Sequence, residues 1–275
     1  MRRCRVGEPK ELIFRREDGI GIITLNRPEK RNAITTPMYE DLRNILEEVR
    51  KRDEIKVVVV TGSGTAFCAG SDAETRLLPR VAADHFVRLE RTRAELLEPV
   101  MLYLAPSFYN LGKPSIAAIN GVAAGAGLSI ALLCDIRIAS ERARFGAGWV
   151  KIGLTPDLGA TFLLPRIIGI DRALKLFYTG EFVDAEEAER IGLVTQVVPH
   201  EELMRVTKEL ATKIAEGPSV AIELTKRAVY RGVVNDFMSQ LYFENYAQDI
   251  CFATDDFREG VKSFQQKRQP AFKGF

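Results

Sequence analysis

Histidine, cysteine and long apolar runs are all scarce in this chain of 275 residues. Two histidines are too few for a histidine-rich metal centre, so we expect no bound metal. The four cysteines lie far apart and form no Cys-x-x-Cys pair, which favours free thiols in a reducing cytoplasm. No apolar run approaches the roughly 20 residues of a membrane span, and no apolar segment follows the basic start Met1–Arg5. These absences predict a cytoplasmic protein without a membrane segment or a signal peptide.

A dominant charge of either sign is also absent. The formal net charge is +2, which gives no electrostatic reason to expect nucleic acid or an anionic membrane as a partner. With 46% hydrophobic and 28% charged residues, the composition is that of an ordinary soluble globular protein. The length is sufficient for one large domain, or for a domain with a small appendage.

The most informative stretch is Ser115–Ser129. It begins with a short apolar segment, Ser115–Ile119, which predicts a buried strand, and it leads through glycines into an apolar helical run, Leu128–Leu133. A strand, a turn of small residues and a helix start bring free backbone N–H groups and the positive end of a helix dipole toward a negative group. Tight packing of a helix on a strand, without any ligand, would explain the same residues. The glycines are Gly121, Gly125 and Gly127.

The two common phosphate-binding patterns are not met in this stretch. No Lys-Ser or Lys-Thr follows the glycines, which excludes a Walker loop. The residue three after Gly127 is Ile130, which breaks the Gly-x-Gly-x-x-Gly spacing. Binding of an oxyanion or a thioester is therefore a better hypothesis than binding of a nucleotide phosphate.

Strand and helix signals alternate over the first 200 residues, which is typical of an α/β fold. Asp18-Gly19 predicts a hairpin between Leu12–Arg16 and Ile20–Leu25, and the valine-rich Ile55–Thr61 predicts a strand buried on both faces. Arg76–Gly112 is charged and mixed, and predicts either a wall over a site or a solvated helix. The other expected strands are Asp135–Ser140, Ala143–Phe145 and Val194–Val198, and the expected helices are Thr36–Arg52, Arg80–Leu104, Ala160–Ile168 and Ala185–Ile191, with Thr36 and Asp184 as N-caps.

From Glu201 onward the composition is helical. Pro218, Gly232 and Asp255 separate three or four helices. We therefore expect two parts: a core of residues 1–200 that holds the site, and a C-terminal helical subdomain of residues 201–275.

Several motifs stand in the order and spacing of the crotonase (enoyl-CoA hydratase/isomerase) superfamily, which the chain resembles from about residue 11 to residue 274. The motifs are Phe67–Asp72, Asn120–Gly127, Cys134–Ile136, Phe145-Gly146, Gly153–Gly159 and the tail Asp256–Arg268. The resemblance implies a spiral of ββα turns with a C-terminal helical subdomain that forms a homotrimer or a dimer of trimers. It also implies an acyl-CoA substrate and no cofactor beyond the CoA group of that substrate.

The resemblance implies roles for individual residues as well. In the family, two backbone N–H groups hold the thioester oxygen, and these positions fall on Ser71 and on Ala126, where glycine is commoner. The basic residues among the implied CoA contacts would equally suit a solvated surface. The implied CoA contacts are Arg27, Lys30, Ala66, Phe67, Cys68, Ala69, Phe264 and Lys267, the last two reaching the CoA of a neighbouring subunit.

The two glutamates that hydratases of the family use are absent, and their positions hold Ser129 and Trp149. Neither side chain can act as a carboxylate, so standard two-glutamate hydration is not expected. The remaining carboxylate is Asp157, at a position where similar isomerase branches carry an acid that moves one proton. We therefore expect an acyl-CoA isomerase or related lyase that stabilises an enolate. The alternative role for Asp157 is an N-cap of the helix that begins near Leu158.

Several other interpretations stay open. Trp149 and Asp157 are spaced as in 4-chlorobenzoyl-CoA dehalogenase. That branch also needs a histidine, and the corresponding position of this chain holds Leu102. Trp149 and Ser129 are expected to line the substrate pocket, where the tryptophan hints at an aromatic or alicyclic acyl group, although a lone tryptophan also suits an ordinary core. A hydratase with a non-standard acid, a hydrolase-like enzyme and a non-catalytic scaffold are the further alternatives. Glu95, Glu98 and Glu141 are the alternative acids.

Overall fold

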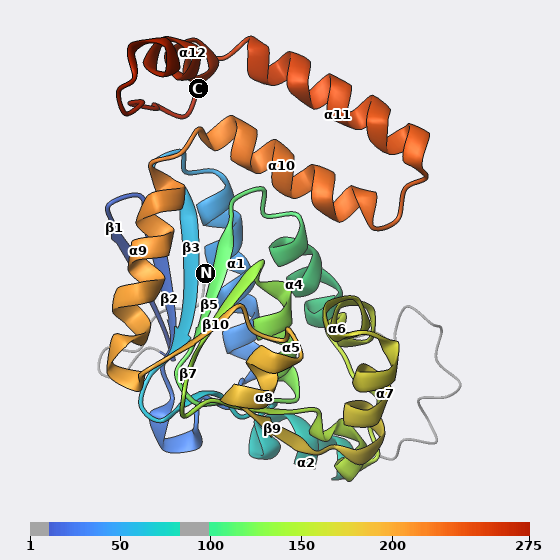
Figure 1. The fold of residues 1–275 in the computed structure, drawn as a ribbon. Helices are drawn as coiled ribbons and strands as arrows, with labels where there is room; N and C mark the ends of the chain where they lie inside the picture. Colours follow the sequence, from blue (N-terminus) through green and yellow to red (C-terminus); the bar gives the residue numbers. More distant parts are fainter. Residues whose placement is uncertain (1–10, 83–98) are drawn as a thin grey trace.

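Two sheets and a set of surrounding helices make up the computed structural model, which describes residues 11–82 and 99–275 (Figure 1). In the larger sheet β1 is antiparallel to β2 and the other neighbours are parallel. The larger sheet has the order β1 (Leu12–Glu17), β2 (Ile20–Leu25), β3 (Val57–Gly62), β5 (Ser115–Ile119), β7 (Ile136–Ser140) and β10 (Gln196–Val198). The smaller sheet has the order β4 (Ala66–Cys68), β6 (Val122–Ala124), β8 (Arg144–Gly146) and β9 (Phe182–Asp184).

Successive turns of the chain add one strand to each sheet: β3 is followed by β4, β5 by β6, and β7 by β8, with helical segments after each pair. This arrangement confirms the expected α/β spiral of ββα turns. The helices are α1 (Thr36–Arg50), α2 (Leu78–Ala82), α4 (Pro99–Tyr109), α5 (Ala126–Leu133), α6 (Ala160–Ile168), α7 (Ile170–Thr179), α8 (Ala185–Arg190), α9 (Leu203–Ala215), α10 (Ser219–Gly232), α11 (Phe237–Phe252) and α12 (Asp255–Gln266). Short helical turns cover Pro28–Lys30, Ala73–Leu77, Gly148–Ile152 and His200–Glu202. Within residues 11–82 and 99–275, none of the helices combines the length and apolarity that crossing a bilayer requires.

The central strands β3 and β5 of the large sheet are buried on both faces. Side chains alternate along each strand, so each face packs into a different core. Val58 and Val60 of β3 point into the main core, which includes α1, α4 and the second sheet, whereas Val57 and Val59 point into a smaller core under α9. Residues 201–215, assigned from the sequence to the C-terminal helical part, thus include a helix that packs on the sheet. Helices α10, α11 and α12 lie beyond the sheet, at one end of the molecule (Figure 1).

A buried polar cluster attaches α10 to the sheet. The Asp135 carboxylate accepts hydrogen bonds from the Ser115 backbone N–H (2.7 Å) and hydroxyl (2.9 Å), at the start of β5. From α10, Lys226 Nζ (2.8 Å) and the Tyr230 hydroxyl (2.7 Å) donate to the same carboxylate. Only 7% of the Lys226 side chain and 18% of the Asp135 side chain are exposed, so this is a largely desolvated ion pair.

We expect Asp135→Ala to lower the free energy of unfolding by about 3 kcal/mol, because it leaves the Lys226 ammonium buried without its counter-ion. Urea unfolding followed by circular dichroism measures the change. The double variant Asp135→Ala with Lys226→Met is the control, since it removes the orphaned charge and should recover part of the loss. An unchanged urea midpoint for Asp135→Ala would contradict this account.

The sequence-based predictions of individual elements are mostly right, with shifted ends. The hairpin is confirmed, with Asp18 (φ 46°) and Gly19 (φ 78°) in the left-handed conformations of its turn. Helix Ala160–Ile168 and the Asp184 cap are confirmed. The predicted N-cap of α1, Thr36, is wrong by one residue. The N-cap is Thr35, whose backbone is extended and whose hydroxyl accepts a hydrogen bond from Met38 N–H at 3.3 Å.

Other expected elements differ more. In place of the helix expected at Arg80–Leu104, α2 already begins at Leu78 and α4 continues to Tyr109, while residues 83–98 lie outside the described part. The short strands β4 and β6 were expected to be loop and turn, and α7 and β9 were not predicted at all. The three-residue strands carry too few residues for a periodic pattern. Helix α7 has ten residues with an amphipathic pattern, which the sequence-based prediction overlooked.

Candidate active site

The ends of two parallel strands bring Ser71 and Ala126 close together. Strand β4 pairs with β6 in the small sheet, and the chain beyond each strand enters a glycine loop. A Cβ at Gly70 would lie 3.1 Å from the Ala124 carbonyl oxygen and 3.9 Å from the Ala126 nitrogen, and Gly70 has a φ of +111°. Only glycine suits that conformation, and it lets the two loops touch.

Both backbone N–H groups at this contact lack a carbonyl acceptor among the described residues. The neighbours of Ser71 form the bridge to Ile34, through Ile34 N–H to Gly70 O (2.8 Å) and Asp72 N–H to Ile34 O (3.0 Å). In this pattern the Ser71 N–H points away from Ile34. Ala126 is the first residue of α5, where N–H groups have no partner within the helix. The two donors are therefore available to an oxyanion.

Gly127 supports the other interpretation of the small-residue turn, in which it allows a helix to pack tightly on a strand. A Cβ at this position would lie 2.1 Å from the Cys68 carbonyl oxygen, so α5 can pack on β4 only with glycine there. The glycine-rich stretch thus allows close packing and at the same time places a helix N-terminus beside Ser71.

Asp157 lies against the first turn of α5. Its Oδ1 accepts a hydrogen bond from Trp149 Nε1 at 3.2 Å. The Ser129 hydroxyl lies 3.1 Å from the Asp157 carbonyl oxygen and 3.5 Å from Oδ1. Ser129 follows Ala126 by three residues, about 4.5 Å along a helix axis, which places the carboxyl group near the candidate oxyanion donors.

The environment of Asp157 favours the protonated carboxyl group. Burial raises its pKa above the usual value, and this outweighs the hydrogen bond from Trp149, the nearby Arg76 charge and the Ser129 hydroxyl, which lower it. The carboxyl group does not cap α6, whose N-cap is Gly159 with no side-chain hydrogen bond. The helix-cap hypothesis for Asp157 is therefore wrong. The next residue, Leu158, has a φ of +50°, a strained conformation for a leucine.

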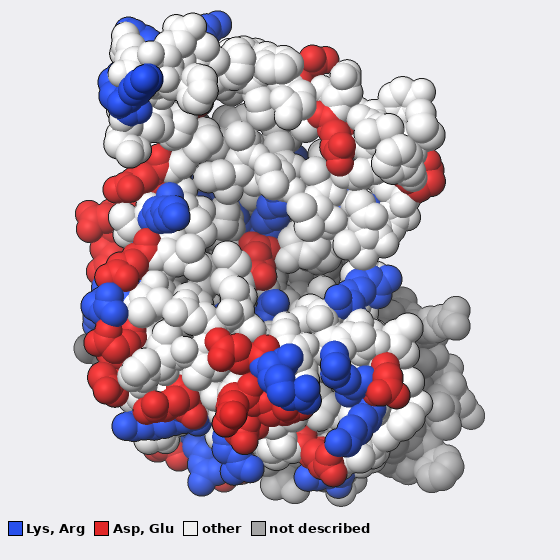
Figure 2. All heavy atoms as spheres, viewed as in Figure 1, with Lys and Arg blue, Asp and Glu red and all other residues white. Residues whose placement is uncertain are grey.

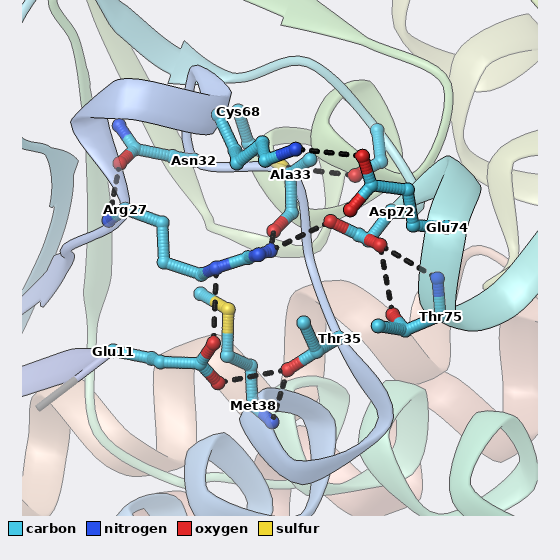
Figure 3. A network of polar contacts seen from close by, with 12 residues as sticks. Glu11, Arg27, Asn32, Ala33, Thr35, Met38, Cys68, Asp72, Glu74 and Thr75 are labelled. Atoms are coloured by element: carbon cyan, nitrogen blue, oxygen red, sulfur yellow. Dashed lines mark hydrogen bonds and ion pairs between the residues drawn. The ribbon is translucent and has the colours of Figure 1, made fainter. Parts of the chain in front are cut away.

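Arg27 belongs to a buried network that supports the Ser71 loop (Figure 3). Its Nη1 donates to Asp72 Oδ2 (2.9 Å) and to the Ala33 carbonyl (2.6 Å), and its Nε lies 2.9 Å from a Glu11 oxygen. Asp72 directly follows Ser71. Burial alone would raise the pKa of Asp72, but the hydrogen bonds from Thr75 and Arg27 hold it below its usual value. In the structure Arg27 thus contacts two carboxylates, and its contact with CoA stays a prediction.

The other predicted CoA contacts are spread over the molecule. Lys30 is exposed and forms an ion pair with Glu74 at 2.8 Å. The side chains of Ala66, Phe67 and Cys68 are buried, so only their backbone could contact a ligand, whereas Ala69 is exposed. Phe264, 86% exposed, lies on α12, and Lys267 is the C-cap of this helix, which lies at the top of the molecule in Figure 1, apart from α6. One chain does not bring these two residues to Asp157.

Two residues near Asp157 were not predicted from the sequence. Tyr39 is fully buried, and Arg76 is 2% exposed with its Cζ 4.6 Å from the centroid of the Tyr39 ring. Arg76 Nη1 donates to the Thr36 hydroxyl at 2.9 Å. Tyr39 lies in the apolar stripe of a helix and Arg76 in a charged segment, so sequence reasoning assigns them to the core and to the surface. Of the alternative acids, Glu141 is exposed, while Glu95 and Glu98 lie outside the described residues.

Comparisons with known proteins find similar chains. The model of the enoyl-CoA hydratase/isomerase family matches residues 15–274. The chain is 37% identical to the short-chain-enoyl-CoA hydratase of Clostridium acetobutylicum (95% of this chain, 97% of that protein). It is 38% identical to the 1,2-epoxyphenylacetyl-CoA isomerase of Escherichia coli K12 (94% of this chain, 96% of that protein). A crystal structure of enoyl-CoA hydratase subunit I from Geobacillus kaustophilus superposes with a TM-score of 0.87 at 36% identity, covering 97% of this chain and 99% of that one.

Proposed function

The chain belongs to the enoyl-CoA hydratase/isomerase (crotonase) family, and on that premise we propose that it isomerises an acyl-CoA by moving a double bond. In this proposal the N–H groups of Ser71 and Ala126 hold the thioester oxygen and stabilise the enolate. Asp157 removes a proton from one carbon of the acyl group and returns it to another. The reaction needs no cofactor beyond the CoA group of the substrate.

The observation that carries the proposal is the environment of Asp157. Burial raises its pKa, and its Oδ1 accepts from the neutral donors Trp149 and Ser129. A carboxyl group whose pKa lies closer to neutrality exchanges protons with carbon acids more effectively than an ordinary aspartate. The two positions at which hydratases of the family carry their acid and their base hold Ser129 and Trp149 in this chain, and neither is a carboxylate.

Hydration is the second candidate, because relatives named hydratase are as similar to the chain as the relative named isomerase. A hydratase usually positions two acid–base groups around the C2–C3 bond. Among the described residues near Asp157 no second carboxylate forms a hydrogen bond with Asp157, Ser129 or Trp149. Isomerisation with one base is therefore the better supported reaction.

Deuterium exchange tests the proposal. The protein is incubated in D₂O with saturated, unsaturated and aromatic acyl-CoAs, and exchange at the α and γ carbons is followed by NMR. We expect exchange at both carbons of at least one unsaturated thioester, without addition of water. Formation of a 3-hydroxyacyl product would favour a hydratase, and CoA binding with no exchange on any thioester would favour a scaffold.

The hydrogen bond from Trp149 predicts a pH effect. This bond stabilises the ionised carboxylate and lowers the pKa of Asp157, so Trp149→Phe should raise that pKa. A base acts only when it is deprotonated, and the acidic limb of kcat/KM against pH should therefore move to higher pH. Phe177→Leu is the control, because it removes the edge contact with the Trp149 ring (centroids 6.2 Å apart) and keeps the N–H donor. An acidic limb that stays in place in Trp149→Phe would exclude Asp157 as the titrating base.

We also propose that the C-terminal helices associate in a homotrimer or a dimer of trimers. Helices α10, α11 and α12, with the turn between α10 and α11, expose many large apolar side chains, and Figure 2 shows few charges over this end of the molecule. A surface of this kind is typical of a protein–protein contact. The side chains are Val229, Val233, Val234, Phe237, Met238, Leu241, Tyr242, Tyr246, Phe252, Phe257, Val261 and Phe264.

Light scattering tests the association. We expect a mass of three or six times the 30.7 kDa chain. Tyr242→Glu should reduce it, because a carboxylate would have to be desolvated in the contact. Tyr178→Glu, on α7, is the matched control, since both tyrosines are 71% exposed. A wild-type protein with the mass of one chain would contradict the proposal.

A further inference from the structure

The Tyr39 hydroxyl is a buried polar group that the proposed reaction does not use. It has no hydrogen-bond partner in the described part of the chain, and the tyrosine is 0% exposed. A buried hydroxyl without a partner destabilises a protein, since it has lost its bonds to water. Such groups are rare in native structures and call for an explanation.

The surroundings of the hydroxyl place it at the candidate acyl site. The charged and polar groups close enough to influence its ionisation are Arg76, Ser71, Asp157 and Cys68. The Ser71 side chain is close enough to lower the pKa of Tyr39, but the two hydroxyls do not have the geometry of a hydrogen bond. Ser71 carries one of the two candidate oxyanion donors, and Asp157 is the candidate base. The hydroxyl is thus close to a group that would hold the thioester and to the group that would move the proton.

The ring of Tyr39 is held in place from two sides. It projects from α1 into the main core, and the Arg76 guanidinium covers it at 4.6 Å. Arg76 is itself anchored to Thr36, three residues before Tyr39 on the same helix. Burial raises the pKa of Tyr39 far above its ordinary value, so the hydroxyl stays neutral and can donate a hydrogen bond.

We propose that the Tyr39 hydroxyl, beside the Ser71 hydroxyl, binds an oxygen atom of the acyl group other than the thioester oxygen. This inference rests on the acyl site of the proposed function and names its substrate class: acyl-CoAs whose acyl group carries a hydroxyl, carboxylate or ring oxygen. A purely hydrocarbon acyl group would leave the hydroxyl buried without a partner in the complex. A site built to bind a substrate oxygen discriminates against the analogue that lacks it.

Binding of thioesters without an aliphatic double bond tests this proposal separately from the reaction, because these acyl groups have no double bond to move. Dissociation constants are measured by calorimetry for two matched pairs: hexanoyl-CoA with adipyl-CoA, and phenylacetyl-CoA with 2-hydroxyphenylacetyl-CoA. We expect wild type to bind the oxygenated member of at least one pair more tightly, by about tenfold for a neutral oxygen and up to about a hundredfold for a carboxylate. Equal affinity within both pairs would overturn the proposal.

Two variants assign the effect to Tyr39. Tyr39→Phe should abolish the preference by weakening only the oxygenated ligand, and its Tm should not fall, because the lost hydroxyl had no partner. Tyr109→Phe is the control: it also loses one hydroxyl, which donates to the Tyr230 carbonyl at 3.3 Å, and it should keep the preference. A preference that survives Tyr39→Phe, or equal weakening of both members of a pair, would contradict the assignment. If the preference holds while deuterium exchange fails, the substrate class stands and the proposed isomerisation does not.

Discussion

We expect Asp157→Asn to lower kcat for double-bond migration by about 10²–10⁴-fold, the usual contribution of a positioned acid–base group. Asparagine has nearly the shape of aspartate, and its carbonyl oxygen can still accept from Trp149 and Ser129. It cannot take up a proton, so the substrate should bind with little change in Kd while turnover is lost. Steady-state assays of the isomerisation, with calorimetric binding of the same acyl-CoA, separate the two effects.

The stability of this variant is an internal control. Because burial raises the pKa of Asp157, the folded protein binds this proton more tightly than the unfolded chain does. The stability that the protonated group contributes is lost as the pH rises through the folded-state pKa. Asparagine stays neutral, so the Tm of Asp157→Asn at pH 7 should be equal to or higher than that of wild type. Full turnover in a folded variant would exclude Asp157 as the base.

The second large effect is expected from Ala126→Pro. Proline removes the N–H that we propose holds the thioester oxygen, and it is tolerated at the first position of a helix, which Ala126 occupies in α5. Loss of one oxyanion donor reduces kcat by about 10²–10³-fold in well-studied cases. The expected result is a folded protein with kcat lowered by that factor, measured by the same assay.

Ala126→Gly is the matched control for the lost donor. It keeps the N–H and removes only the methyl group, so turnover should stay close to that of wild type. If Ala126→Pro has normal turnover and a normal circular dichroism spectrum, then this N–H does not stabilise the enolate. If both variants lose activity equally, the methyl group and not the N–H is responsible.

The fold could be predicted largely from the sequence, because long periodic segments carry its main strands and helices. The valines of β3 alternate between two cores, and α6 has the predicted bounds. Of the small sheet only β8 was predicted, as Ala143–Phe145, and the other strands were missed, since each has only three residues. These short strands depend on the partners they find in the folded chain, which a local pattern does not reveal.

The candidate site was predicted less completely. Asp157, Ser71 and Ala126 were predicted from a resemblance of motifs, and the structure places the carboxyl group of Asp157 against the helix that begins with Ala126. Tyr39 and Arg76 were missed for a physical reason. A tyrosine in an apolar helix stripe resembles core, and an arginine among charged residues resembles surface. The fold buries both, and it brings Arg76 close enough to Asp157 to lower the pKa of that carboxyl group.

Label transfer tests the central claim, one carboxylate moving one proton, most directly. An acyl-CoA that exchanges in D₂O and has its double bond between the α and β carbons is prepared with deuterium at its γ carbon. It is converted in H₂O in a single turnover, and the product is analysed by NMR and mass spectrometry. If Asp157 carries the proton from carbon to carbon, part of the deuterium appears at the α carbon with wild type, and Asp157→Asn forms no labelled product. A product that carries only solvent hydrogen at the α carbon, or one that has gained water, would contradict a single-base isomerase.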